Sequence, residues 1–369
     1  MKVPDQAIQL LHHAEAPVSQ TRAVIGLDGF VDRIIRVVDK KQRDGSETYL
    51  QKIPDFGARI LAAAGKSTKF ELSIQQIKLG GNGPIMAGAL ASFGVPLTCI
   101  GNLGDPEPHA VFQPMKRFCK LLTIADAGYT DALEFDDGKL MLSSQQACEQ
   151  VTWNTIERVI GKEAFLRLLD EANFIALNNW SALPHMSEIW KRCQAEVCPS
   201  LSKKNRHLFF DLADPGFRLA EDIREALDLI AKFESFFSTT LGLNQKEAAE
   251  VAEILNLTIK GNDDREYVQR SAEAIRSKLG IHGVVVHATA FAAAASTKRS
   301  ALIDGPFAEK PLISTGAGDH FNAGYNLGQI LGGELEECLQ LGVATSGYYV
   351  RTAQSPSLLE LRSFLQQIR

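Results

Sequence analysis

Short apolar runs rich in β-branched residues alternate along this chain with segments of helical periodicity. The runs cover residues 23–25, 97–100, 174–177, 207–210 and 283–287. The helical segments cover residues 84–93, 163–171, 217–233, 246–255 and 267–279. In the segment 217–233, one face collects Leu219, Ile223, Leu227 and Ile230, as a helix packed on a sheet requires. This alternation predicts an α/β fold with a mainly parallel central sheet.

Two segments, 33–78 and 120–144, break this rhythm. Both contain short alternating stretches and turn sequences such as Asp136-Asp137-Gly138. They predict strands of a small separate sheet, which at the mouth of an α/β core would form a lid that keeps water from a reacting group. An ordinary edge hairpin is the simpler interpretation. Because no internal repeat or linker divides the chain, we expect one domain over residues 1–369 with the lid inserted in it.

The composition is that of an ordinary globular protein, and it excludes several classes of partner. Of 369 residues, 45% are hydrophobic and 22% are charged, and the formal net charge is −5. A negative chain has no general attraction for nucleic acid or an anionic membrane, so we expect neither as a partner. The start of the chain carries Lys2 alone as a basic residue, unlike a signal peptide, and the most apolar run, 283–295, is shorter than the roughly 20 residues of a membrane helix. These features predict a cytoplasmic protein.

The cysteine and histidine residues show no disulfide or metal-binding pattern. Six cysteines are scattered along the chain, and neither a Cys-x-x-Cys pair nor a Cys/His zinc spacing occurs. We therefore expect reduced cysteines that act as small apolar residues, and no metal centre built from Cys and His.

The most informative motif is Thr315-Gly316-Ala317-Gly318-Asp319, which precedes a predicted helix over residues 321–331. Because Gly316 and Gly318 carry no side chains, successive backbone N–H groups are able to converge on an anion at the positive end of the helix. A carboxylate repels phosphate, so we predict that Asp319 instead accepts the proton of a substrate hydroxyl that attacks a γ-phosphoryl group. The alternative is a tight turn with Asp319 as the N-cap. A dinucleotide-binding fingerprint fits less well, because the third glycine comes late.

Two further motifs carry groups suited to a sugar. The paired glycines Gly80 and Gly81 let a small polar ligand approach the backbone, and Asn82 both donates and accepts hydrogen bonds, which suits a hydroxyl. Asp28 and Asp32 follow the first predicted strand, where open α/β sheets place ligand groups. Each motif also has a structural interpretation, as loop chemistry for the glycines and as a turn or cap for the two Asp residues.

A fourth motif, Asn244-Gln245-Lys246-Glu247, opens a predicted helix. Asn244 as N-cap and Glu247 at the third helical position form a capping-box pattern, which needs no function. The functional interpretation is that Asn244 and Glu247 face the phosphates of a nucleotide and hold Mg²⁺ through its retained waters. On these residues alone both interpretations stay open.

Taken in order, the motifs resemble those of the ribokinase-like (PfkB) carbohydrate kinase family, and the resemblance runs from about Val24 to Ser357. The region Gly80-Gly81-Asn82-Gly83 looks like the N-terminal signature of that family, Asn244-x-x-Glu247 like its metal and phosphate motif, and Thr315–Asp319 like its C-terminal signature. The resemblance implies a ribokinase-like three-layer α/β/α sandwich with a mainly parallel central sheet and a small β-sheet lid. It also implies ATP with Mg²⁺, and it allows a homodimer formed through the lid.

The resemblance assigns roles to individual residues. It implies that Asp319 is the general base, that Gly316, Ala317 and Gly318 form the anion hole, and that Asp32 and Gly81 touch the acceptor. Asp28, Gly80 and Asn82 are further candidates for binding the acceptor.

Three departures from the family pattern bear on specificity. Ile85 stands five residues after the first glycine of the pair, where family members commonly have Asn, so one of the usual contacts to the sugar is missing. Ile313 stands where an acidic residue often precedes the catalytic Asp by six positions, which puts a monovalent-cation site in question. Thr289 is followed by Phe291 and Ala294 where the family usually has Thr-x-Gly-x-x-Gly, so Thr289 is expected to meet a phosphate while nucleotide preference stays open.

We conclude from the sequence that the protein transfers the γ-phosphoryl group of ATP to a hydroxyl of a small sugar or sugar-like molecule. An acceptor that is a nucleoside, a sugar phosphate or a sugar acid is the first alternative. A sugar phosphate would require a basic side chain in the pocket, for which Arg33 and Arg36 are candidates. The second alternative is a non-catalytic sensor that binds nucleotide or sugar with the same fold.

Overall fold

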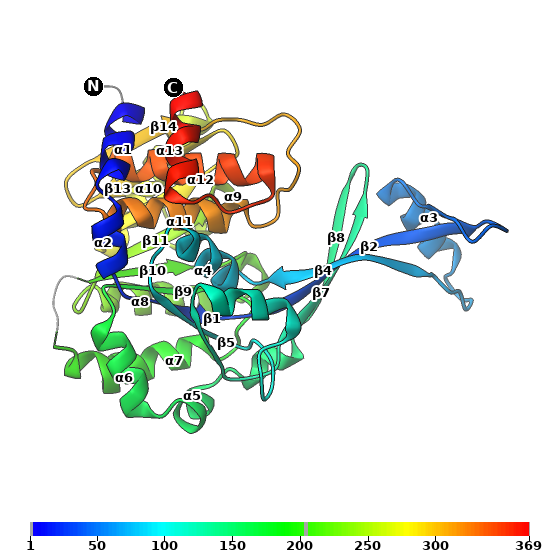
Figure 1. Cartoon of the computed structure of the whole chain (residues 1–369), viewed down its shortest axis with the longest axis horizontal. Helices are drawn as coiled ribbons and strands as arrows, with labels where there is room; N and C mark the ends of the chain where they lie inside the picture. Colours follow the sequence, from blue (N-terminus) through cyan, green and yellow to red (C-terminus); the bar gives the residue numbers. More distant parts are fainter. Residues whose placement is uncertain (1–2, 203–205, 369) are drawn as a thin grey trace.

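The computed structural model describes residues 3–202 and 206–368, and nine strands in these ranges form the central sheet (Figure 1). The order across the sheet is β14-β13-β12-β11-β10-β9-β1-β5-β6. Neighbours from β6 to β12 run parallel, whereas β13 and β14 are antiparallel. The strands are β1 (Ala23–Leu27), β5 (Leu97–Gly101), β6 (Lys120–Thr123), β9 (Phe174–Asn178), β10 (His207–Asp211), β11 (Ser238–Asn244), β12 (Gly283–His287), β13 (Phe291–Ser296) and β14 (Ser300–Asp304). The prediction of a mainly parallel sheet is confirmed, and all five predicted runs lie in it.

Helices cover both faces of this sheet, so the predicted three-layer architecture is confirmed. One face packs against α5 (Trp153–Val159), α6 (Lys162–Glu171), α7 (Met186–Arg192), α8 (Ala220–Phe233), α9 (Gln245–Ile254) and α10 (Asp264–Leu279). The other packs against α1 (Val3–His12), α2 (Glu15–Gln20), α4 (Asn82–Ser92), α11 (Ala317–Ile330), α12 (Leu335–Thr352) and α13 (Leu358–Gln367). Because side chains alternate along a strand, Phe209 of β10 enters the second core while Leu208 and Phe210 enter the first.

The helix predicted over residues 321–331 begins earlier than the sequence suggested. Helix α11 starts at Ala317, and Gly316 is its N-cap residue with a left-handed φ of 90°. Asp319 therefore lies in the first turn of the helix, and the alternative interpretation of Asp319 as N-cap is wrong. Glycines inside α11 allow close helix packing, since a Cβ on Gly324 would collide with the Leu341 carbonyl oxygen of α12.

A separate sheet of five strands, counted over the described residues, projects from the body of the molecule (Figure 1). It contains β2 (Phe30–Lys41), β3 (Glu47–Tyr49), β4 (Leu72–Gly80), β7 (Gly128–Phe135) and β8 (Gly138–Ser144), with α3 (Ile53–Ala62) beside it. The second inserted segment was predicted to begin at residue 120, and this boundary is wrong, because β6 (Lys120–Thr123) pairs with β5 in the central sheet. The first segment begins at Phe30 instead of residue 33 and includes a helix that the strand pattern did not predict. We call this sheet with α3 the lid.

The lid has its own small core and an apolar exposed surface. Ile35, Val37, Leu50, Phe56, Leu133 and Phe135 form the core. Exposed apolar side chains on its outer strands are Leu72, Ile74 and Ile77 of β4 and Met141 and Leu142 of β8. Exposed apolar side chains on a projecting sheet are typical of an interaction surface.

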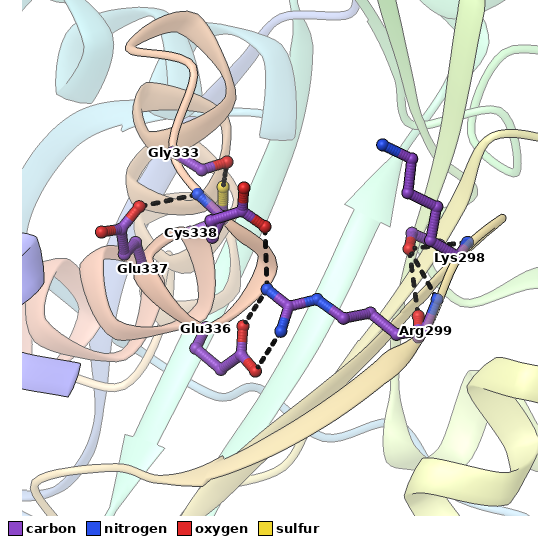
Figure 2. A network of polar contacts seen from close by, with 8 residues as sticks. Lys298, Arg299, Gly333, Glu336, Glu337 and Cys338 are labelled. Carbon is purple, nitrogen blue, oxygen red and sulfur yellow. Dashed lines mark hydrogen bonds and ion pairs between the residues drawn. The ribbon is translucent and has the colours of Figure 1, made fainter. Parts of the chain in front are cut away.

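A charged network joins the β13–β14 turn to the start of α12 (Figure 2). Arg299 donates to Glu336 and to Glu334, each at 2.9 Å. Since the turn lies at the amino end of the parallel strands, the network braces the fold away from the carboxyl ends where ligand groups collect. The three side chains are partly or largely exposed, so the expected contribution is below about 1 kcal/mol.

The structure also bears on the cysteines and on the possibility of a membrane-spanning helix. All six cysteines are free thiols, and five of them are buried. Over the residues that the structure describes, none of the helices combines the length and the apolar character needed to cross a membrane.

Candidate active site

Polar side chains, among them the predicted Asp28 and Asn244, gather at the carboxyl ends of the parallel strands. Asp28 follows β1, Asn179 follows β9, Asp211 ends β10, Asn244 ends β11 and His287 ends β12. Adjacent parallel strands present their carboxyl ends at one edge of the sheet, so side chains from distant parts of the chain meet there. The amino ends of α4 and α11 face the same edge, since Asn82 at the start of α4 contacts Asp319 in the first turn of α11.

Asp28 is fully buried beneath the start of α4. One carboxylate oxygen accepts the Gly83 N–H at 2.8 Å, and the other accepts the Asn82 N–H at 2.9 Å and the Asn179 side-chain amide at 2.7 Å. Burial raises the pKa of Asp28 to about 6, although these three hydrogen bonds favour the charged form. With both oxygens occupied by protein donors, Asp28 holds the glycine loop in place, whereas the sequence had suggested contact with the acceptor.

Asn82 and Asp319 are in direct contact across the site. The side-chain amide of Asn82 donates to the Asp319 carboxylate at 2.9 Å, although the two residues are 237 positions apart in the sequence. The N-terminal and C-terminal motifs therefore form one site. Gly81 enters α4 with a φ of 94°, and a Cβ there would lie 2.7 Å from an Asp28 oxygen, so glycine is required for the turn.

The electrostatics of Asp319 suit a general base. The side chain is 6% exposed, and burial together with the negative charges of Asp211, Asp28 and Glu247 raises its pKa well above the ordinary value. The hydrogen bond from Asn82 acts in the opposite direction by stabilising the carboxylate. A base works best when its pKa lies near the working pH, and this environment moves an aspartate in that direction.

The loop of the predicted anion hole leads into α11. Gly318 lies against His287, since a Cβ on Gly318 would be 3.2 Å from the imidazole Cε1. The Ala317 N–H donates to the Ser314 carbonyl at 3.1 Å, so it would have to leave that partner to bind a phosphate oxygen. Gly316 and Gly318 are therefore better placed than Ala317 to supply N–H donors at this helix end.

Two side chains outside the motifs hold this loop. His320 Nδ1 contacts the Gly316 carbonyl at 2.7 Å, and since a carbonyl only accepts, this nitrogen carries the proton. The other ring nitrogen accepts from Ser355 at 2.8 Å, and burial lowers the pKa of His320 to about 4. The ring stacks on Tyr349 with centroids 3.6 Å apart, and the Tyr349 hydroxyl donates to the Thr315 carbonyl at 3.0 Å. Both carbonyls at the start of the loop are thus fixed by buried or half-buried side chains.

A second group of carboxylates lies at the ends of β10 and β11. The predicted capping box is confirmed: Asn244 accepts the Glu247 N–H at 3.0 Å, and Glu247 accepts the Asn244 N–H at 2.8 Å. Burial and the charge of Glu247 raise the pKa of Asp211 to about 8. Asp211 also accepts the Asn322 side-chain amide at 2.7 Å, while Asn322 Oδ1 is buried without a partner. A buried carboxyl whose pKa is raised by a neighbouring carboxylate marks a place where a bound cation would be stabilised.

A cavity of about 420 Å³ adjoins the anion-hole loop on the side of β11 and β12. Asn244 and Thr289, the two residues predicted to meet the nucleotide, both line it, together with Gly318. Its remaining wall is mainly apolar and includes Phe291, Pro306, Phe321, Val343 and Val350. A cavity with an apolar wall at one end and helix N–H groups at the other is suited to a base attached to phosphates.

Asp32 and Gly80 face each other where the lid joins the body. They lie on the paired strands β2 and β4, and any side chain at position 80 would collide with the Asp32 carboxylate. Asp32 is 5% exposed, and burial raises its pKa while Lys78 and Lys139 lower it. The structure therefore places Asp32 beside Gly80 and adds two lid lysines to its surroundings.

The structure also reveals residues that the sequence analysis missed. Asp211 directly follows a predicted strand and Asn179 lies two positions beyond another, so the position of ligand groups at strand ends was a signal that could have found them. Asn322 and Lys139 carried no such signal, because their contacts join segments far apart in the sequence. Ile85, which replaces the expected Asn, packs near Gly316, where a Cβ would lie 3.3 Å from its side chain.

Comparison with known proteins gives a consistent result over nearly the whole chain. A family model described as prokaryotic ketohexokinase matches residues 6–368. A curated ketohexokinase from Haloferax volcanii is 28% identical over 345 residues, which cover 93% of this chain and 90% of that protein. A ribokinase from Arabidopsis thaliana, solved with ribose and ATP, aligns with a TM-score of 0.64 at 15% identity over 94% of this chain and 98% of its own. A ribokinase from Thermotoga maritima aligns with a TM-score of 0.62 at 16% identity, over 94% of this chain and 99% of its own. At these identities the two structures bear on the fold alone.

Proposed function

Because the chain belongs to the prokaryotic ketohexokinase family and is therefore a carbohydrate kinase, we propose that it transfers the γ-phosphoryl group of ATP to a hydroxyl of a ketohexose. The keto-sugar follows from the names of the family and of the Haloferax relative. The hydrogen bond between Asn82 and Asp319 carries the proposal. It joins a residue suited to sugar hydroxyls to a base at the positive end of a helix, in a site next to a cavity suited to a nucleotide.

In the proposed reaction, the acceptor lies between Asp32, Asn82 and Asp319. Asp319 accepts the proton of the reacting hydroxyl while its oxygen forms a bond to the γ-phosphorus. The bond from that phosphorus to the bridging oxygen breaks, and ADP leaves with the electron pair. The N–H groups of Gly316 and Gly318 stabilise negative charge on the phosphoryl oxygens in transit.

The nucleotide is proposed to occupy the cavity lined by Asn244 and Thr289, with its phosphates toward Gly318. Two observations support this placement. The apolar wall suits a base, and the cavity adjoins the amino end of α11. The Arabidopsis ribokinase of the same fold was solved with ATP, which agrees with this choice of phosphoryl donor.

Magnesium fits the carboxylates of Asp211 and Glu247. The described residues contain no cluster of three or more His, Cys, Asp or Glu side chains able to hold a metal. Mg²⁺ commonly takes only one or two carboxylates and completes its shell with water and substrate phosphates, so a pair is enough. Each oxygen of Asp211 and Glu247 already accepts one protein N–H and retains a second lone pair. Bound there, the ion would neutralise charge on the β- and γ-phosphates.

The alternative acceptors have less support in the structure. Arg33, one candidate for gripping a sugar phosphate, is paired through two nitrogens with Asp131, at 2.6 and 2.7 Å. Arg36 lies 3.6 Å from Asp136 and donates to Gln51. Both guanidinium groups thus have partners within the lid. A sensor without catalysis would have no need of a buried carboxylate with a raised pKa, so Asp319 favours an enzyme.

We also propose that two copies pair through their lids. The exposed apolar side chains of β4 and β8 lie at opposite edges of a sheet that projects from the body (Figure 1). A second copy that packs against either edge would remove some of them from water, which favours association.

The test is ADP release with Mg-ATP over a panel of ketohexoses, aldoses, nucleosides, sugar acids and sugar phosphates. We expect turnover to be strongest with a ketohexose. Asp319→Asn should keep the fold and nucleotide binding but lose about 10²–10⁴-fold in kcat, the usual contribution of a general base. Asp228→Asn, a change at an exposed position on α8, is the matched control and should keep full activity. Strong turnover of another class with silence on ketohexoses would overturn the substrate, and near-normal activity of Asp319→Asn would overturn the mechanism.

A further inference from the structure

Lys139 connects the lid to the loop in front of the anion hole. It lies at the start of β8, and its ammonium group donates to the Thr315 hydroxyl. Thr315 directly precedes Gly316, the N-cap residue of α11. A cationic side chain from the lid is thus placed within one residue of the helix end where phosphate is expected.

The surroundings of Lys139 point toward the acceptor as well. The positive charges of Lys78 and Lys139 both lower the pKa of the Asp32 carboxyl, and Lys78 and Lys139 repel each other. Partial desolvation of the ammonium, followed by the charge of Lys78, lowers the pKa of Lys139. Two like charges that approach each other repel, and an anion bound between them would relieve this repulsion. Lys139 therefore lies between the carboxylate proposed to bind the acceptor and the loop proposed to bind the phosphoryl group.

We propose that Lys139 is a catalytic residue that binds the γ-phosphoryl group as it passes from ATP to the acceptor. This inference rests on the proposed kinase function and adds a residue that no sequence motif contains. The lysine remains protonated throughout, while Asp319 accepts the hydroxyl proton. The new bond forms between the acceptor oxygen and phosphorus, and the bond to the bridging oxygen of ADP breaks. The contribution of Lys139 is electrostatic, because a fixed cation stabilises charge that spreads over the phosphoryl oxygens.

Placement on the lid gives this cation a second consequence. Transfer of the phosphoryl group to water is avoided if the catalytic groups come together only when the acceptor is bound. A cation on the lid reaches the phosphoryl group only when the lid covers the site, so closure over the sugar and completion of the site occur together. Lys139→Met should therefore reduce sugar phosphorylation and also the slower hydrolysis of ATP in the presence of a non-reactive sugar.

Two other roles for Lys139 predict different results. If Lys139 served only to hold the lid closed through its hydrogen bond to the Thr315 hydroxyl, Lys139→Met would have no further effect on kcat once that hydroxyl was removed. A binding site for a phosphate group on the acceptor itself would raise KM for a sugar phosphate and leave kcat largely unchanged.

The experiment measures kcat and KM for Lys139→Met and Lys139→Arg in the full chain, with Lys66→Met as the control. Lys66 is an exposed lid lysine between α3 and β4, remote from the motifs that form the site. Lys139→Met, alone and in the Thr315→Val background, completes a double-mutant cycle. Thermal unfolding of each variant verifies that the fold is retained.

We expect Lys139→Met to lower kcat by about 10²-fold with little change in either KM, as for loss of one group that stabilises transition-state charge. Lys139→Arg should recover part of this loss, because it restores the positive charge, and Lys66→Met should behave as wild type. The effect of Lys139→Met should be the same in the Thr315→Val background. Unchanged kcat in Lys139→Met, or an effect that disappears in the Thr315→Val background, would overturn the proposal.

A second measurement separates this proposal from the substrate assignment. ADP with aluminium fluoride mimics the phosphoryl group in transit, and its complex with the protein can be followed by calorimetry without turnover. We expect Lys139→Met to weaken this complex by about the same factor as kcat while binding ADP alone as well as wild type. If wild type formed the complex but phosphorylated no ketohexose, the substrate assignment would fail and Lys139 would still be tested. Equal binding of the mimic by both proteins would refute the role of Lys139.

Discussion

The hydrogen bond from Asn82 to Asp319 makes a quantitative prediction about the pH dependence of catalysis. The bond is 2.9 Å long, and it stabilises the charged form of a carboxylate whose pKa is otherwise raised by burial. A hydrogen bond to a charged group contributes about 1.5–3 kcal/mol. Since one pKa unit corresponds to 1.36 kcal/mol, Asn82→Ala should raise the pKa of Asp319 by about one to two units.

The direction of the effect on activity follows from the proposed role of Asp319 as general base. A general base is active when deprotonated, so activity is lost as pH falls through its pKa. A higher pKa moves this loss to higher pH. The profile of kcat/KM for the acceptor against pH reports groups of the free enzyme, and its acidic limb should therefore shift upward by about one to two units in Asn82→Ala.

Asn179→Gly is the matched control for this measurement. Asn179 also donates a buried side-chain amide in the site, but to Asp28 at 2.7 Å instead of Asp319. Glycine tolerates the left-handed φ of 60° at this position. Loss of this bond favours the neutral form of Asp28, which removes a negative charge near Asp319, so the acidic limb should stay or move slightly down. An unshifted or lowered limb in Asn82→Ala, with activity retained, would refute the assigned role of the bond.

Two further predictions contrast buried carboxylates with different partners. Asp28→Asn replaces one acceptor oxygen by a donor that faces N–H groups. It should lower the free energy of unfolding at pH 7, measured by urea titration, by about 3 kcal/mol. A loss below about 1 kcal/mol would contradict the anchoring role of Asp28. Asp211→Asn should require more Mg²⁺ for half-maximal turnover, yet leave the metal-free protein at least as stable at pH 8. The folded protein keeps the Asp211 proton up to a pKa of about 8, whereas the unfolded chain releases it near pH 4, so Asp211 lowers folding stability as pH rises from about 4 to 8. Asn322 Oδ1 is in addition available to accept from the new amide. Lower stability of metal-free Asp211→Asn would show that its carboxylate is structural.

Local patterns in the sequence were sufficient for much of the fold. The five apolar runs are strands of the central sheet, because a buried parallel strand is recognisable from a short continuous apolar segment. The capping box at Asn244 and Glu247 is present, because its two hydrogen bonds join residues three positions apart. The errors came where local sequence was ambiguous. The helix predicted from residue 321 begins at Ala317, so Gly318 was placed before it instead of inside it. Strand β6 was assigned to the lid because a strand pattern does not say which sheet a strand joins.

The candidate site shows the same division between local and distant relations. The glycine motifs and Asp319 could be identified from the sequence, because a helix end with free N–H groups and a nearby carboxylate is a local arrangement. Other features depend on the order of strands and the position of the lid. They are the contact of Asn82 with Asp319, the burial of Asp28, the proximity of Asp211 to Glu247 and the hydrogen bond of Lys139 to Thr315. Backbone hydrogen bonding and periodicity fix each element within a few residues along the chain, but side chains more than a hundred positions apart meet only when the packing of the sheet and its helices is complete.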